Sequence, residues 1–294
     1  MTAQRRIGQF KVSPIGLGAM PASFEGAPRE RGIAMVHAAL DNGITLIDTA
    51  DIYAPAWDQM GHNERLVAEA LRSYQGDKAN VVVATKAGIT RAAGEKWGRN
   101  GKADYIRGRL EASLENLGVD KIDLYYLHRP DRTMVYADEV ESFAALKQEG
   151  LVSEIGISNA NVEEIGIALD VLGEGNLAAV QNEFSPRFNH TSKQELDFCA
   201  EHDIALLPFS PLGGTGGGAA KVGETYPVLA EVAEAHGVSP QRVVLAWMLA
   251  LSEHLIPIPG ASRPETIADS AAAMKLVLEA EEVARISHAL LARQ

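Results

Sequence analysis

The chain has 294 residues, of which 46% are hydrophobic and 22% are charged, so it can bury a large core. Its net charge of −12 argues against nucleic acid or an anionic membrane as a partner, because both need a basic surface. A single cysteine, Cys199, rules out an internal disulfide, and no apolar run resembles a secretory signal or reaches membrane-spanning length. We therefore expect a soluble, cytoplasmic protein.

Short apolar segments alternate with segments of helical periodicity along almost the whole chain. After a hairpin expected at 7–12, the predicted strands are 15–20, 45–48, 81–86, 122–128, 152–158, 177–182, 204–209 and 255–259. The predicted helices are 29–42, 63–74, 104–117, 139–149, 161–172, 193–202 and 239–251, with two more near 265–274 and 280–291. Strands that alternate with helices in this way pair in parallel through right-handed crossovers.

The eight strand–helix units predict an α/β fold, a (β/α)8 TIM barrel that spans residues 1–294 as one domain. A short N-terminal hairpin would precede it and extra C-terminal helices would follow it. Asn63 and Ser239 stand where a capping side chain would begin a helix.

Two glycine-bearing segments invite a phosphate-binding interpretation. Gly16 and Gly18 lack the third glycine and the immediate helix of a dinucleotide-binding fold, so close backbone packing or the approach of a ligand explains them better. The segment 213–218, Gly-Gly-Thr-Gly-Gly-Gly, follows the seventh strand. It suits either a plain linker or a phosphate-binding or lid loop, and the sequence favours neither.

Polar side chains stand at the expected carboxyl ends of successive strands, namely Asp48, Lys86, His128, Ser158, Asn159, Gln181, Asn182 and Ser210. A single residue of this kind is usually a solvated loop charge or a structural side chain. In a barrel, however, the carboxyl ends of all strands meet at one face, where barrel enzymes place their active sites. The joint occurrence of these residues therefore favours a functional site.

Tyr53 follows the strand that ends at Asp48, and it has the chemistry of a proton donor if a cation lies beside it. A free tyrosine has a pKa of about 10, and a neighbouring ammonium such as Lys86 is expected to lower it. Asp48 would keep Lys86 charged, and His128 would hydrogen-bond a substrate oxygen. The set suits proton donation to a carbonyl oxygen while a hydride reaches the carbon, which implies a nicotinamide cofactor and no metal.

Several ordered motifs carry a family resemblance. They are Asp-Thr-Ala-Asp-Ile-Tyr at 48–53, Ala-Thr-Lys at 84–86, Leu-His-Arg-Pro-Asp at 127–131, Gly-Ile-Ser-Asn at 156–159, Val-Gln-Asn-Glu at 180–183, Phe-Ser-Pro-Leu-Gly at 209–213 and Ile-Pro-Gly-Ala-Ser-Arg at 258–263. Together they resemble the aldo-keto reductase superfamily over nearly the whole chain.

The resemblance implies an enzyme that reduces a small-molecule aldehyde or ketone with NADP(H), with Tyr53 as the general acid. The catalytic tetrad that it implies is Asp48, Tyr53, Lys86 and His128. The cofactor-binding residues that it implies are Ser158, Asn159 and Gln181 for the nicotinamide carboxamide, Phe209 for the nicotinamide ring, Ser210, Leu212 and Gly213 for the pyrophosphate, and Ser262 and Arg263 for the 2′-phosphate. Trp57 and Trp97 are candidates to line the substrate pocket.

Some positions depart from the family pattern. Phe209 stands where many members have a tyrosine, and Thr266, Asp269 and Ser270 replace the Gln or Arg, Glu and Asn often found near the adenine. Two other functions stay open: a cofactor-binding regulatory or redox-sensing subunit with little turnover, and a Schiff-base aldolase with Lys86 as nucleophile. Cofactor binding without turnover would indicate the first, and borohydride trapping of substrate on Lys86 would indicate the second.

Overall fold

The structure, a computed structural model, describes residues 4–23, 27–214 and 218–291. The strands are β1 (Arg5–Ile7), β2 (Phe10–Val12), β3 (Leu17–Gly18), β4 (Leu46–Asp48), β5 (Val82–Ala87), β6 (Ile89–Ala92), β7 (Lys96–Arg99), β8 (Ile122–Leu127), β9 (Val152–Ser158), β10 (Leu177–Glu183) and β11 (Ala205–Phe209). The α-helices are α1 (Arg29–Asp41), α2 (His62–Ser73), α3 (Ala103–Leu117), α4 (Tyr136–Gln148), α5 (Val162–Leu172), α6 (Ser192–Glu201), α7 (Val222–Thr225), α8 (Pro227–His236), α9 (Pro240–Leu251), α10 (Pro264–Ala272) and α11 (Ala280–Leu291).

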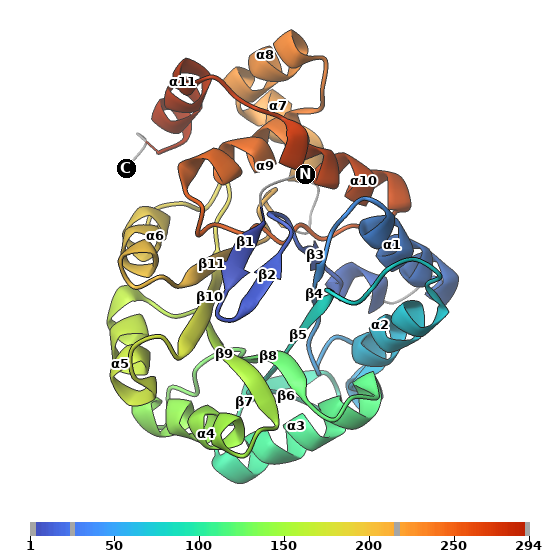
Figure 1. Ribbon diagram of the computed structural model, residues 1–294, viewed down its shortest axis with the longest axis vertical. Helices are drawn as coiled ribbons and strands as arrows, with labels where there is room; N and C mark the ends of the chain where they lie inside the picture. Colours follow the sequence, from blue (N-terminus) through green and yellow to red (C-terminus); the bar gives the residue numbers. More distant parts are fainter. Residues whose placement is uncertain (1–3, 24–26, 215–217, 292–294) are drawn as a thin grey trace.

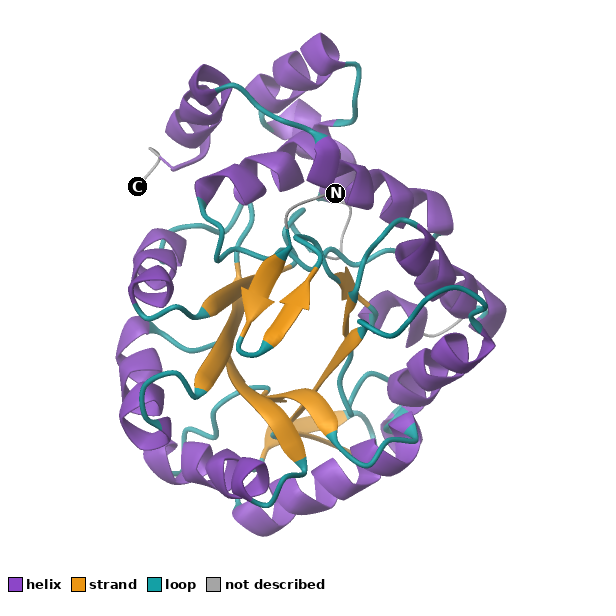
Figure 2. Cartoon of the chain, viewed as in Figure 1, coloured by secondary structure: helices purple, strands orange, loops and turns teal. Residues whose placement is uncertain are grey.

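Parallel strands form the wall of a nearly closed barrel, in the order β11-β10-β9-β8-β5-β4-β3. Helices surround this wall on the outside, so that the strands are buried (Figure 2). A strand that is buried on both faces needs apolar side chains in both directions. On β4, Leu46 packs inside the barrel and Ile47 packs against the surrounding helices. The barrel predicted from the alternation of strands and helices is confirmed.

The segment 254–260 occupies the eighth position of the barrel wall, where a strand was predicted. The N–H of Ile256 donates to β11 at 2.9 Å, and the carbonyls of Pro257 and Pro259 each accept from the backbone in and just before β3 at 3.0 Å. Only isolated bridges result, because neither proline has an N–H to donate in return. The prediction of a regular strand at 255–259 is wrong, although this segment does close the barrel.

The closing segment also explains the two early glycines. A Cβ atom on Gly18 would lie 2.9 Å from the carbonyl oxygen of Ile258, and one on Gly16 would lie 2.9 Å from the Ile258 side chain. Real Cβ contacts are longer than this, so a larger residue would force β3 and the closing segment apart. Of the two explanations that we predicted for these glycines, close packing or the approach of a ligand, close packing is confirmed for both, and Gly18 also borders the cavity described below.

The hairpin β1–β2 is antiparallel, as predicted, and lies across one end of the barrel (Figure 1). It contacts the start of two strands. The N–H of Gln9 donates to Glu154 on β9 at 2.9 Å, and Ser13 exchanges two hydrogen bonds with Thr45, just before β4. The hairpin therefore covers the amino ends of the strands and leaves their carboxyl ends accessible.

Helices α8 and α11 form an extra layer that packs on α9 outside the main ring (Figure 1). On α9, Trp247 is completely buried and its indole nitrogen donates to Ser287 of α11 at 2.9 Å. The predictions include α11 but not α8, although Pro227 at its first position and Gly237 after its end are ordinary helix signals.

One predicted cap is wrong. Helix α2 already begins at His62, and Asn63 lies inside its first turn. The buried Asn63 side chain accepts from the Thr49 hydroxyl at 2.6 Å and donates to the Ala19 carbonyl at 2.9 Å. It thus connects α2 to the carboxyl ends of β3 and β4 instead of capping a helix. The cap at Ser239 is confirmed, since its hydroxyl accepts from the backbone of α9 at 3.1 Å.

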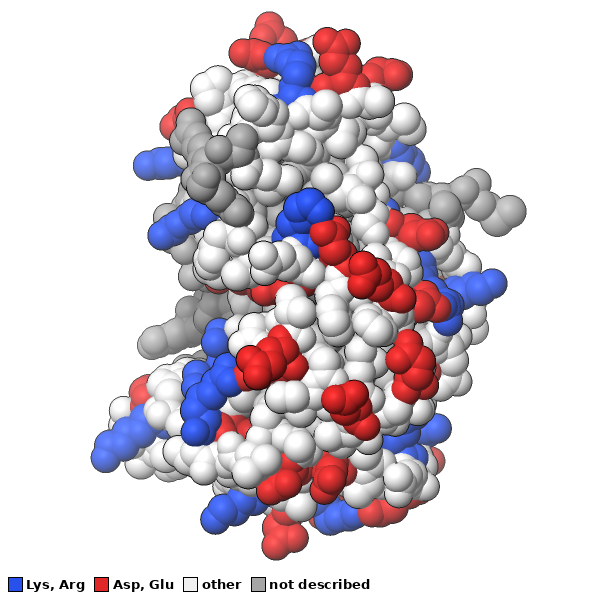
Figure 3. Space-filling view, turned by 90° about the vertical axis from the view of Figure 1, so that its left-hand side faces the viewer, with Lys and Arg blue, Asp and Glu red and all other residues white. Residues whose placement is uncertain are grey.

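Acidic and basic side chains are interspersed on the face that carries α5 and α6 (Figure 3). Among the described residues on this face, acidic side chains lie between many of the basic ones, in keeping with the net charge of −12. None of the helices in the described part of the chain is both long enough and apolar enough to cross a bilayer.

Candidate active site

Side chains alternate along each parallel strand, and this brings three polar residues to the inside of the barrel. Leu46 on β4 points into the interior cluster, so Asp48, two residues further on, points the same way. By the same period Lys86 extends inward from β5, and His128 follows the inward-facing Tyr126 of β8. The three side chains meet at the carboxyl end of the barrel.

Lys86 lies at the centre of this group. Its Nζ donates to Oδ1 of Asp48 at 2.5 Å and to the Thr49 carbonyl at 2.7 Å, and it lies 3.4 Å from the Tyr53 hydroxyl. Gln181 Nε2 donates to the other oxygen of Asp48 at 2.8 Å. Lys86 is 0% exposed and Asp48 is 3% exposed, so either charge would be costly to bury without the other. The ammonium is therefore fixed beside the tyrosine.

The charges in this group determine which atoms hold protons. Burial alone would lower the pKa of Lys86, but Asp48 and Tyr53 outweigh burial and the pKa is raised. Burial raises the pKa of Tyr53, and the Lys86 charge offsets that effect only in part. We predicted that Lys86 would lower the tyrosine pKa below its free value. This prediction is wrong, because the loss of water around the phenolate raises the pKa of Tyr53 more than the Lys86 charge lowers it.

The His128 ring stands edge-on to Tyr53, with ring centroids 5.7 Å apart and planes at 83°. Burial, together with the charges of Lys86 and Arg129, lowers the pKa of His128 well below its usual value, so the imidazole is neutral. Its buried Nδ1 has no hydrogen-bond partner within the described segments. Asn159 Nδ2 donates to the His128 carbonyl at 3.1 Å, which fixes the backbone at this point. A neutral imidazole held in this way can hydrogen-bond a ligand oxygen.

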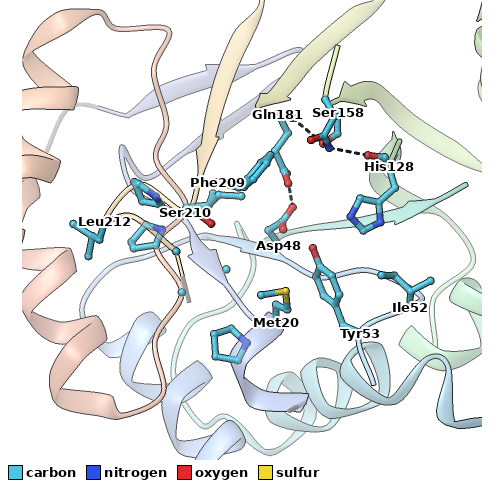
Figure 4. Close-up of a pocket in the computed structure, with 18 of the residues that line it drawn as sticks. Met20, Asp48, Ile52, Tyr53, His128, Ser158, Gln181, Phe209, Ser210 and Leu212 are labelled. Atoms are coloured by element: carbon cyan, nitrogen blue, oxygen red, sulfur yellow. Dashed lines mark hydrogen bonds between the residues drawn. The ribbon is translucent and has the colours of Figure 1, made fainter. Parts of the chain in front are cut away.

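Asp48, Tyr53 and His128 line a cavity of about 440 Å³ at the carboxyl end of the barrel (Figure 4). This volume is typical of a small-molecule site. In Figure 4 the Tyr53 hydroxyl points toward Asp48, with the His128 ring beside it. The predicted site residues that line the cavity are Asp48, Tyr53, His128, Ser158, Asn159, Gln181, Phe209, Ser210 and Leu212.

Four predicted site residues do not line the cavity. Lys86 is completely buried behind its wall, and Gly213 directly precedes Gly214, which does line it. Ser262 and Arg263 are exposed. They lie at the start of α10, only a few residues beyond the part of the closing segment that lines the cavity.

The three predicted amide-binding residues form one network. Ser158 Oγ donates to the Gln181 carbonyl at 2.7 Å, and Asn159 Nδ2 donates to Ser158 Oγ at 2.9 Å. Asn159 has a φ of +59°, which few residues other than glycine adopt and which asparagine tolerates. The network uses the Asn159 amino group and leaves its oxygen as an acceptor, which suits an amide N–H of a ligand.

The segment 209–214 curves along the cavity wall after β11. Ser210 has a φ of +52°, and Gly213 and Gly214 have φ values of +95° and +73°. These left-handed conformations turn the backbone sharply, so that both Ser210 and Leu212 reach the cavity. Residues 215–217 of the glycine-rich loop lie outside the described residues, and the choice between linker and lid stays a prediction.

The residues near the predicted adenine end differ in how they are engaged. Asp269 accepts from the Ser239 hydroxyl and from Arg242 Nη2, each at 2.5 Å, so its carboxylate already has partners. Arg263 directly precedes α10, which begins with Pro264. The N–H groups of a helix start attract phosphate, and an adjacent guanidinium strengthens that attraction.

The sequence did not predict two parts of the cavity wall, the hairpin β6–β7 and Arg129. The hairpin β6–β7, which was not predicted, is attached to the segment before Trp57 because Arg91 donates to the carbonyls of Ile52 and Ala54 at 3.0 and 2.8 Å. It carries Trp97, which lines the cavity as we suggested, whereas Trp57 does not. Arg129 also lines the cavity, and its place directly after His128 was the signal that could have revealed it.

Comparison with known proteins gives a consistent result. The model of the Aldo/keto reductase family matches residues 14–290. A 6-dehydroglucose reductase from Novosphingobium aromaticivorans is 33% identical over 284 residues, which cover 93% of this chain and 91% of that protein. The structure of a glycerol dehydrogenase from Gluconobacter oxydans has a TM-score of 0.82 at 26% identity, with 100% of this chain and 97% of that chain covered. An aldo/keto reductase from Klebsiella pneumoniae, in complex with NADP and acetate, has a TM-score of 0.79 at 27% identity, with 99% and 96% covered.

Proposed function

The chain belongs to the aldo/keto reductase family, and we propose that it is an NADPH-dependent oxidoreductase that reduces aldehyde or ketone carbonyls to alcohols. The observation that carries the proposal is the position of the Tyr53 hydroxyl. It faces the cavity beside the neutral His128 and lies 3.4 Å from the buried ammonium of Lys86. These are the groups needed to orient a carbonyl and to give it a proton.

Each of these residues has a separate task in the proposed reaction. His128 hydrogen-bonds the carbonyl oxygen and holds it next to Tyr53. Tyr53 gives its hydroxyl proton to that oxygen, and the phenolate that remains is stabilised by Lys86. Asp48 keeps the ammonium charged and in place through its 2.5 Å contact. Solvent then returns a proton to the tyrosine.

The residues around the cavity fit a nicotinamide dinucleotide. An amide network at Ser158, Asn159 and Gln181 lies on one wall, the Phe209 ring borders the cavity, and Arg263 stands at a helix start nearby. When bound, the reduced nicotinamide supplies a hydride, which carries two electrons to the carbonyl carbon, and becomes oxidised. The Klebsiella relative in complex with NADP supports the phosphorylated form.

The test is NADPH oxidation with short-chain, aromatic and sugar-derived carbonyls, the last suggested by the 6-dehydroglucose reductase among the relatives. We expect turnover with at least one class and alcohol formed in equal amount to the cofactor oxidised. The Tyr53→Phe variant serves as the matched control, since it keeps the ring and loses only the hydroxyl. Tight cofactor binding without turnover over the whole panel would contradict the proposal and indicate a regulatory or redox-sensing subunit.

A further inference from the structure

Two hollows meet at the carboxyl end of the barrel. The first is the cavity of about 440 Å³ that contains Tyr53 and His128. The second, of about 700 Å³, is a more open groove lined by β6–β7 and by the loop after β8. Trp97 and Arg129 belong to the walls of both. A ligand whose carbonyl lies at Tyr53 would therefore extend past Arg129 toward the groove.

The Arg129 guanidinium has no close partner among the residues that the structure describes. The side chain is half-buried, and no described residue accepts a hydrogen bond from it or forms an ion pair with it. Burial and the charge of Arg99 lower the pKa of Arg129, and Tyr53 and Glu183 counteract this only in part. Charged groups that are withdrawn from water are normally paired. An arginine in this state can bind an anion, and none of the described residues supplies one.

The rest of the groove is positive as well. Arg99 and Arg132 line it together with Arg129, and the one carboxylate among the lining residues is Asp131. Asp131 accepts two hydrogen bonds from Thr133, at 2.7 and 3.1 Å. Arg132 is paired with Glu164, outside the groove lining. This local excess of positive charge contrasts with the net charge of −12 for the chain, and a positive hollow concentrates anionic ligands.

We propose that the preferred substrates are carbonyl compounds that carry a second, anionic group, a carboxylate or a phosphate, and that Arg129 binds this group while the carbonyl oxygen faces Tyr53 and His128. The planar fork of a guanidinium donates two charge-assisted hydrogen bonds to either anion. The inference rests on the proposed carbonyl reduction and adds the substrate class to it. Arg129 is then a specificity-determining residue.

The first experiment compares matched substrate pairs with the full chain and NADPH. Succinic semialdehyde is measured against butanal, and glyceraldehyde 3-phosphate against glyceraldehyde, so that the two anions are distinguished. We expect the native chain to favour at least one anionic member in kcat/KM. In Arg129→Gln this preference should fall on the order of 10- to 100-fold, as expected for charge-assisted hydrogen bonds. Arg129→Lys, which keeps the charge but not the fork, should lie between the two.

The control for a general change in charge is Arg107→Gln, on the outer helix α3. Arg107 is partly exposed and paired with Glu149, and it is not among the residues that line either hollow. This variant should keep the substrate preference of the native chain. No preference for either anion in the native chain, or an unchanged preference in Arg129→Gln, would overturn the inference while leaving carbonyl reduction intact. A loss confined to NADPH affinity in Arg129→Gln would also overturn it.

A second measurement does not depend on turnover. Succinate, which carries carboxylates but no reducible carbonyl, is titrated into the native chain and into Arg129→Gln by calorimetry. The anion site is supported if the native chain binds succinate and Arg129→Gln binds it at least about tenfold more weakly, as the loss of charge-assisted hydrogen bonds predicts. Equal affinity, or no binding to the native chain, overturns it. If no carbonyl is reduced at all, the proposed function fails, and the titration alone then decides whether Arg129 binds anions.

Discussion

Lys86 Nζ lies 2.5 Å from Oδ1 of Asp48, in an ion pair that is buried between β5 and β4. Such a pair is costly to bury and much more costly to break, because removal of one partner leaves the other charge uncompensated. The pair therefore holds the ammonium at one position, beside the Tyr53 hydroxyl. It also makes both the chemistry and the stability of the barrel sensitive to either residue.

The first prediction concerns the proton donor. Tyr53→Phe should lower kcat for carbonyl reduction by roughly 100- to 10,000-fold, the usual cost of losing a positioned acid. NADPH affinity should stay the same, because the hydroxyl is the only group removed. Steady-state kinetics and a fluorescence titration of NADPH measure the two effects. Near-normal turnover in this variant would remove Tyr53 from its assigned role.

The second prediction concerns pH. A general acid must hold its proton, and burial, offset in part by Lys86, raises the pKa of Tyr53. The rate of reduction should therefore stay level through neutral pH and fall only above about pH 10. Burial lowers the pKa of His128, so no acid limb with a midpoint near the usual histidine value of about 6.5 should appear. A pH profile of kcat/KM for one uncharged aldehyde tests both points, and a midpoint near neutrality would contradict them.

The third prediction is a double-mutant cycle on the buried pair. Asp48→Asn and Lys86→Met should each destabilise the fold by roughly 3 to 5 kcal/mol, because each leaves a buried partner charge. The double variant should be less destabilised than the sum of the two, since no unpaired charge remains. Urea unfolding of the four proteins gives the coupling free energy. Strict additivity would mean that the pair contributes nothing beyond its separate side chains.

The fourth prediction concerns the cofactor phosphate. Arg263→Ala should weaken NADPH binding by about 2 kcal/mol or more, given the strength of charged hydrogen bonds, and NADH binding far less. Arg285→Ala is a suitable control because Arg285 is exposed and paired with Glu231 on the outer helices. Isothermal titration with both cofactors gives the comparison. Equal weakening of NADPH and NADH would show that Arg263 contacts something other than the 2′-phosphate.

The fifth prediction concerns Asp51, which is 0% exposed and accepts from Arg109 Nε at 2.7 Å. Burial, opposed by Arg109, raises the pKa of Asp51 to about 7. The folded chain then binds more protons than the unfolded chain, so this residue's contribution to stability is lost as pH rises from about 4 to above 7.

Between roughly pH 5 and pH 8 the native chain should lose about 2 to 3 kcal/mol of unfolding free energy that Asp51→Asn does not lose. Urea unfolding at both pH values measures the difference. Asp58→Asn, at an exposed position, should keep the pH dependence of the native chain. An identical pH dependence in Asp51→Asn would show that Asp51 ionises normally in the folded state.

The barrel could be predicted from the sequence because its evidence is local and repeated. Apolar segments buried on both faces alternate with helical periods, and Ser239 marks a helix start in the sequence as it does in the structure. Asp48, Lys86 and His128 were found for a related reason. Each stands at the carboxyl end of an apolar strand, and in a barrel such positions converge whatever the loops do. Their proximity in the fold could therefore be predicted although they lie far apart in the sequence.

The tertiary structure decided what depends on surroundings contributed by many segments. The pKa of Tyr53 is one example: the sequence shows that a lysine is near, but only the assembled barrel shows that burial has the larger effect. The Arg129 guanidinium, for which the described residues offer no close partner, is another, because its surroundings depend on which side chains of β6–β7 and of the loop after β8 come close. Hydrophobic periodicity is a property of one segment, whereas desolvation and charge pairing depend on atoms far apart in the chain. For that reason the sequence determined the fold and the polar strand ends, and the structure alone determined their protonation and the charge of the space around them.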